Sequence, residues 1–155
     1  MSYLTFKALH ILGVVLFLGS ILFTAWWKLI ADRTRDPRVI AFAQRQVART
    51  DWVFTASGAL ILLIGGHAAI WWSGMDLRNT PWLFTGDLLF ILSGLIWLSI
   101  LVPVQRAQAR LAREFADGGE IPDRYWRLCR IWNIVGTVAT LLPLAVIYFM
   151  VFKPV

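Results

Sequence analysis

Residues 4–27, LTFKALHILGVVLFLGSILFTAWW, and residues 52–72, WVFTASGALILLIGGHAAIWW, decide the fold of this chain. Each stretch is apolar enough and long enough to cross about 30 Å of hydrocarbon as a helix. Residues 82–102 and 131–152 meet the same requirement. Only helices satisfy the backbone of such spans, because an isolated strand leaves N–H and C=O groups unpaired in lipid. We therefore predict an all-α fold, a four-helix transmembrane bundle.

The composition excludes a soluble domain. The chain has 155 residues, of which 59% are hydrophobic and nine are tryptophan. The apolar run of the first span exceeds that of a typical signal peptide and lacks a small-x-small cleavage site, so we expect this span to be retained. Residues 1–155 are predicted to form a single membrane domain. Tryptophans gather at the ends of the spans, as in aromatic belts at the headgroups: Trp26, Trp27, Trp52, Trp71, Trp72, Trp82, Trp126 and Trp132.

The positive charges fall mainly on two of the connections. Twelve of the fifteen lysines and arginines lie between the first and second spans or between the third and fourth. Positive residues favour the cytoplasmic side, so both termini are predicted on the outer, periplasmic side of a bacterial inner membrane. This distribution serves orientation and contact with anionic lipid, and it argues against a nucleic-acid partner. The twelve are Lys28, Arg33, Arg35, Arg38, Arg45, Arg49, Arg106, Arg110, Arg113, Arg124, Arg127 and Arg130.

The connections differ in length and predicted structure. The outer one, residues 73–81, is short and turn-like. Asp36-Pro37 is typical of a helix N-cap followed by proline, and it predicts an amphipathic helix that continues into the second span. The third span is predicted to extend through residues 105–115 until Gly118-Gly119 ends it, with a new helix beginning near Asp123. We therefore expect helical cytoplasmic extensions.

The chain has only two histidines, and both lie within apolar spans. His10 comes six residues after Leu4, and His67 comes five residues before Trp72. Because consecutive spans are antiparallel, both rings are predicted roughly 8–9 Å below the outer face. Asp87 of the third span is predicted at roughly 7–8 Å. Ionisable residues within spans usually mark a function, because their burial in lipid is costly without a partner.

The neighbours of these residues leave several interpretations open. The His10 face is otherwise small or polar except for Phe17, which indicates that it faces the bundle. Gly65-Gly66 allows either a flat ligand or a neighbouring helix to come close. Lys7 reaches outward or pairs with Asp87. Asp87 is either an ion-pair partner of Lys7 or Arg78, or a proton carrier. The fourth span carries a polar stripe that we expect to hydrogen-bond between helices: Asn133, Thr137 and Thr140.

Two imidazoles at one depth on adjacent helices suit a metal or the iron of a haem. A bare transition metal such as iron or zinc is one alternative, and haem b fits an apolar, aromatic-rich bundle better. No Cys-x-x-Cys-His sequence is present, so covalent attachment is excluded. Ligation by both His10 and His67 favours electron transfer, whereas ligation by His10 alone leaves room for substrate chemistry. Cys129, the only cysteine, is predicted to be inert.

Several short segments resemble the bacterial membrane-embedded, haem-b-containing protoporphyrinogen oxidase family. They are FKALHI at 6–11, PWL at 81–83, REFADG at 113–118 and VFKPV at 151–155. The resemblance implies that His10 binds haem. Where that family has an essential lysine after its Pro-Trp, this chain has Thr85-Gly86-Asp87, so the oxidase activity is left open. The whole chain resembles more closely an uncharacterised family of predicted four-span bacterial integral membrane proteins, which implies a fold and no activity.

The sequence therefore predicts a haem-b-binding membrane protein that acts in electron transfer or as a small oxidoreductase. His10 and His67 are the predicted iron ligands, Asp87 is the predicted proton carrier, and a quinone or another redox partner is implied. The alternative is a non-catalytic membrane subunit that docks a partner through its basic cytoplasmic helices. A homodimer is compatible with either function.

Overall fold

Four long helices make up the structure, a computed structural model that describes residues 2–154. Two of them are single elements, and the other two each consist of three elements joined end to end. Each of the four is long and apolar enough to cross a membrane, and no strand occurs within the described residues, which confirms the predicted fold class. The elements are α1 (Tyr3–Thr34), α2 (Pro37–Thr50), η1 (Asp51–Ala56), α3 (Ser57–Ser73), α4 (Pro81–Ile96), η2 (Trp97–Leu101), α5 (Val102–Glu114) and α6 (Asp123–Phe152).

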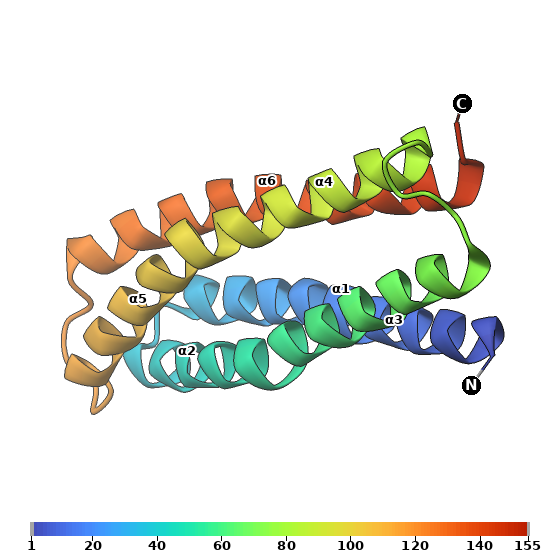
Figure 1. Cartoon of the computed structure of the whole chain (residues 1–155). Helices are drawn as coiled ribbons and strands as arrows, with labels where there is room; N and C mark the ends of the chain where they lie inside the picture. The colour runs from blue at the N-terminus through green and yellow to red at the C-terminus, as the bar shows by residue number, and fades with distance from the viewer. Residues whose placement is uncertain (1, 155) are drawn as a thin grey trace.

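The helices form two antiparallel pairs, α1 with α3 and α4 with α6, stacked as two layers (Figure 1). Both chain ends and the connection between α3 and α4 lie at one end of the bundle, which we call the terminal end. The helices α2 and α5 lie at the other end, which we call the arginine-rich end. Both termini thus lie on one side, as predicted.

Glycines bring α1 and α3 into direct backbone contact. A Cβ atom built on Gly58 would lie 2.7 Å from the backbone nitrogen of Phe17, and one on Gly65 would lie 2.6 Å from that of His10. Gly13 makes the equivalent approach to the Leu62 backbone. Small residues are the usual means of close helix packing in lipid, where apolar burial between helices provides little drive.

The α4–α6 pair and the contacts between layers depend on side chains. Ser93 Oγ donates to the Ala139 carbonyl at 2.7 Å, which ties α4 to α6. Between the layers, the rings of Phe17 and Phe90 meet edge to face, with centroids 5.3 Å apart. The two layers therefore touch at points along the span and do not pack as continuous surfaces.

At the arginine-rich end the helices converge on a buried core, as the predicted helical extensions require. α2 begins where the Asp36 carboxylate accepts the backbone N–H groups of Arg38 and Val39, with Pro37 at the first helical position. α2 packs on α1 and α5, and α5 packs on α6. The core consists of Ile40, Ala41, Leu111, Ala112, Phe115, Tyr125 and Cys129.

Two π-helical turns, η1 and η2, interrupt the long helices near the start of this end. Pro103 follows η2 and has no N–H to donate back to the preceding turn, which accounts for the altered hydrogen bonding there. The Trp52 and Trp97 rings of the two turns meet edge to face, with centroids 5.8 Å apart. Such turns were not predicted, and they are frequent at functional sites.

Candidate functional site

The ring of His10, on α1, and the ring of His67, on α3, lie at the same level along the axis of α3. Nδ1 of His10 lies 2.8 Å from the Leu62 carbonyl oxygen, and Nδ1 of His67 lies 3.0 Å from the Leu63 carbonyl oxygen. Because a carbonyl only accepts, each Nδ1 carries the donated proton, and in the neutral form of the ring Nε2 is then the nitrogen with the free lone pair. Successive carbonyls are about 1.5 Å apart along a helix axis. The structure therefore agrees with the predicted equal depth.

The two rings nevertheless lie on different sides of α3, because successive carbonyls are turned by about 100° around the axis. The His10 ring lies in the contact between α1 and α3: a Cβ atom on Gly66 would come within 2.8 Å of its Nδ1. Of the two predicted uses of Gly65-Gly66, the structure has the close helix contact.

His67 points from the α1–α3 layer towards α4. Its Nε2 lies 3.5 Å from Oδ1 of Asp87, and the two side chains are 50% and 23% exposed. Lys7 lies 6.0 Å from the Tyr3 ring and, among residues 2–154, forms no ion pair. Among residues 2–154, neither Lys7 nor Arg78, the two predicted partners, pairs with Asp87, and the structure brings it to His67 instead. Within the described part of the chain, no group of three or more His, Cys, Asp or Glu side chains gathers to hold a metal ion.

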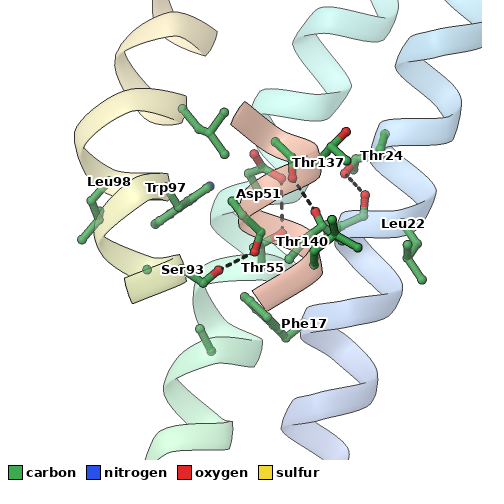
Figure 2. A pocket seen from close by; sticks show the side chains of 18 of the residues that line it. Phe17, Leu22, Thr24, Asp51, Thr55, Ser93, Trp97, Leu98, Thr137 and Thr140 are labelled. Carbon is green, nitrogen blue, oxygen red and sulfur yellow. Dashed lines mark hydrogen bonds between the residues drawn. The ribbon is translucent and has the colours of Figure 1, made fainter. Parts of the chain in front are cut away.

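A large cavity of about 900 Å³ lies between the two layers (Figure 2). Side chains of α1, η1, α3, α4, η2 and α6 line it, and most of its wall is apolar. Leu63 and Phe90, which line it, lie about one helical turn from His67 and Asp87 respectively. The His67–Asp87 contact therefore lies just beyond the cavity on the side of the terminal end.

Asp51 of η1 lies in the wall of this cavity (Figure 2). Its Oδ1 accepts the Thr55 hydroxyl at 3.2 Å, and its Oδ2 accepts the Gln105 amide at 2.8 Å. The Thr55 hydroxyl in turn lies 2.9 Å from that of Ser20 on α1. Asp51 was not predicted as a site residue, because it directly precedes the second predicted span, where a charged residue usually belongs to the connection.

The polar stripe of α6 also faces the cavity (Figure 2). The Thr137 and Thr140 hydroxyls donate to carbonyls of their own helix, each at 2.8 Å. The Asn133 carboxamide forms no hydrogen bond with any of residues 2–154. The predicted hydrogen bonds between helices are therefore wrong for this stripe, because the layers stand too far apart there.

A second polar cluster is largely buried at the arginine-rich end. Lys28 is 1% exposed, and its Nζ donates to Asp32 at 2.9 Å and to the Tyr125 hydroxyl at 3.1 Å. The Tyr125 hydroxyl donates to Asp32 at 3.0 Å. The Cys129 sulfur lies 3.6 Å from Lys28 Nζ and 3.2 Å from the amide of Gln108. This network joins α1 to α6 and α5.

The predicted contact with anionic lipid is therefore wrong for Lys28, because its ammonium group faces the bundle. The sequence did contain the signal: Lys28 continues by one turn the small and polar stripe of α1 through Ser20 and Thr24. Nearby, neither side-chain amide atom of the buried Gln44 has a hydrogen-bond partner among residues 2–154.

The amino-acid sequence matches a known protein family. Residues 4–154 match a family described as predicted integral membrane protein (DUF2269). The chain belongs to this family. With its four spans, it is an integral, multi-pass membrane protein. No curated protein and no solved structure matches it.

Membership of the DUF2269 family accounts for the surface of the long helices. Large apolar side chains are exposed along every span, and in the bilayer they contact lipid chains. The side chains of α2 and α5 instead alternate between the buried core and exposed arginines. The bilayer therefore covers the spans, and the arginine-rich end projects from it.

Proposed function

We propose that this protein binds one haem b near the terminal end of the bundle, and that it acts in electron transfer or in a small oxidoreductase reaction. The observation that carries the proposal is the hydrogen bonding of the two imidazole rings. Each donates Nδ1–H to a backbone carbonyl, which fixes the tautomer with Nε2 available. Metal-binding histidines are usually held in this way.

The local packing favours His67 as the ligand. Backbone contact between α1 and α3 at Gly65 leaves no room for a porphyrin between the two rings. His67 is half exposed and borders the interlayer cavity, so its Nε2 is accessible in the present arrangement. His10 becomes a second axial ligand only if α1 and α3 separate at this level.

Haem supplies one-electron chemistry when bound, and the side chains supply its setting. Asp87, 3.5 Å from Nε2 of His67, is the nearest carboxylate and is proposed to hold or release a proton there. The resemblance of residues 6–11 to the haem-b-containing oxidase family also supports a haem at this level.

Absorption spectra of the purified protein from haem-replete cells test the proposal. We expect a Soret band, its loss in His67→Ala, and its retention in Trp71→Phe, an exposed aromatic control one turn away. A low-spin six-coordinate spectrum that becomes high-spin in His10→Ala assigns His10 as the second ligand. A colourless protein, or a band unchanged in His67→Ala and His10→Ala, contradicts the proposal.

The exposed arginines support both an orientation and a second candidate function. None of the arginines at the arginine-rich end forms an ion pair with the described residues. They fit the cytoplasmic face of a bacterial inner membrane, with both termini periplasmic. Reporter enzymes fused to the C-terminus test this: a periplasm-dependent reporter is expected to be active, and activity of a cytoplasm-dependent one contradicts it.

The second candidate is a non-catalytic subunit that docks a protein partner, or a second copy, through this surface. Arg45, Arg49 and Arg110 are exposed on α2 and α5. Reversing all three charges to glutamate is expected to abolish co-purification of the partner, whereas Arg78→Glu in the α3–α4 connection leaves it intact. A colourless protein whose partner is lost only in the triple variant favours this function over haem binding.

A further inference from the structure

The interlayer cavity is a second site, distinct from the histidines. It begins about one turn from His67 and extends towards the arginine-rich end as far as Asp51 and Trp132. Its volume of about 900 Å³ is within the range of small-molecule sites. Both π-helical turns contribute to its wall, and such turns are frequent at functional sites.

The cavity opens sideways to the bilayer. Seven of its lining side chains are also among the exposed apolar residues of the spans: Leu22, Trp26 and Leu29 on α1, Ile91, Leu95 and Leu98 on α4 and η2, and Leu141 on α6. A molecule dissolved in the lipid phase therefore reaches the cavity without crossing the headgroups. This access selects a hydrophobic ligand.

The polar atoms of the wall select the headgroup. The Asp51 carboxylate accepts hydrogen bonds from Thr55 and Gln105, and the Trp97 side chain is a further donor to it, which leaves room for one more because an ionised carboxylate has about four acceptor positions. The Asn133 carboxamide offers both a donor and an acceptor and has no partner within residues 2–154. A ligand that carries a hydroxyl donor for Asp51 and a separate oxygen acceptor for Asn133 matches these polar groups of the wall.

Two rival headgroups fit less well. No lysine or arginine lines the cavity within residues 2–154, so a phosphate would have no counter-charge. An ammonium headgroup suits Asp51 but accepts no hydrogen bond from Asn133. The aromatic rings of Phe17, Phe90 and Trp97 in the wall favour a flat headgroup.

We propose that this cavity binds a lipid-soluble quinol, with a headgroup hydroxyl donating to Asp51 and the ring lying among the aromatic side chains. The binding is separate from the proposed haem site and does not depend on it. An oxidised quinone has only acceptors to present to the carboxylate, so the reduced form binds more tightly.

Calorimetric titration of the full-length protein in detergent, under anaerobic conditions, tests the proposal with decylubiquinol as the probe. We expect saturable binding that weakens about tenfold or more in Asp51→Asn, the loss of one hydrogen bond to a charged group. The dimethyl ether of decylubiquinol lacks both hydroxyl donors. It should bind the unmodified protein as weakly as the quinol binds Asp51→Asn, and Asp51→Asn should not weaken it further.

A second variant fills the cavity without touching Asp51. Gly94 lines the cavity, and a Cβ atom there meets nothing within 4 Å, so Gly94→Leu is expected to extend its side chain into the cavity and to occupy the site. Gly19 is equally open but lies outside the lining, and Gly19→Leu is the matched control. We expect Gly94→Leu to abolish quinol binding and Gly19→Leu to preserve it.

Three results overturn the proposal: no saturable binding, binding unchanged in Asp51→Asn or in Gly94→Leu, or stronger Asp51-dependent binding of dodecyltrimethylammonium than of the quinol. If Asp51→Asn does not fold, comparison of quinol binding by Gly94→Leu and by Gly19→Leu tests the proposal. A colourless protein leaves this titration interpretable, and failed titration leaves the haem spectrum interpretable, so the two proposals fail separately.

Discussion

The two ends of the bundle use ionisable residues in opposite ways. At the arginine-rich end, Lys28 and Tyr125 are buried and tie α1 to α6 through Asp32. At the terminal end, His67 and Asp87 meet at 3.5 Å while both remain partly exposed. The buried network of Lys28, Asp32 and Tyr125 therefore holds the two layers together. The exposed pair of His67 and Asp87 is free to exchange partners, as a ligand site requires.

Removing the buried charge should have the largest effect on stability. Lys28→Ala leaves the Asp32 carboxylate and the Tyr125 hydroxyl without their shared donor, and loss of one partner of a buried pair typically costs about 3–5 kcal/mol. Unfolding by denaturant in micelles measures this change. Lys153→Ala, at an exposed lysine, is the control, and equal losses in the two variants would remove the basis of the comparison.

Separating α1 from α3 should have the next largest effect. Gly65→Ala places a methyl group against the His10 backbone nitrogen, and overpacking of this kind costs about 1–3 kcal/mol. Gly94→Ala, in open space, should be neutral or slightly stabilising because alanine is the better helix former. The free energy of unfolding in micelles measures both changes. If Gly65→Ala is as stable as the unmodified protein, α1 and α3 can move apart at this contact at little cost.

Breaking the exposed pair should cost little. Asp87→Asn removes a contact between partly exposed groups, which is typically worth about 1 kcal/mol or less. Its free energy of unfolding should therefore lie close to that of the unmodified protein. A loss of unfolding free energy as large as that of Lys28→Ala would mean that the ionisable residues of the two ends contribute equally to stability.

The smallest effect is local and depends on pH. In the α3–α4 connection, hydrogen bonds from the Asn79 side chain and from the backbone N–H groups of Arg78 and Asn79 hold the pKa of Asp76 below its ordinary value of 3.8. A lowered folded pKa means that the turn is favoured above pH 3.8 and loses this contribution as the pH falls through the lower value. NMR shifts of the Asn79 amide should follow this titration, and Asp76→Asn should abolish it.

The sequence anticipated part of the site and missed the rest for a definite reason. Equal depth of His10 and His67 follows from rise per residue alone, and it agrees with the structure. Their different directions around α3 depend on which helices pair. Asp51 and Lys28 sit next to span boundaries, where a charge usually faces water, so only the packing of neighbouring helices reveals that they turn inwards.

The four spans, their helical state, the helical extensions and the common side of the two termini are all predictable from the amino-acid sequence. These follow from local chemistry, because apolar length, backbone hydrogen bonding in lipid, and caps such as Asp36-Pro37 act within one segment. Only the tertiary structure decided that glycines join α1 to α3, that the layers enclose a cavity, and that Lys28 is buried. Those features arise between segments distant in the chain, and in lipid helix association depends on shape and polar contacts more than on hydrophobicity.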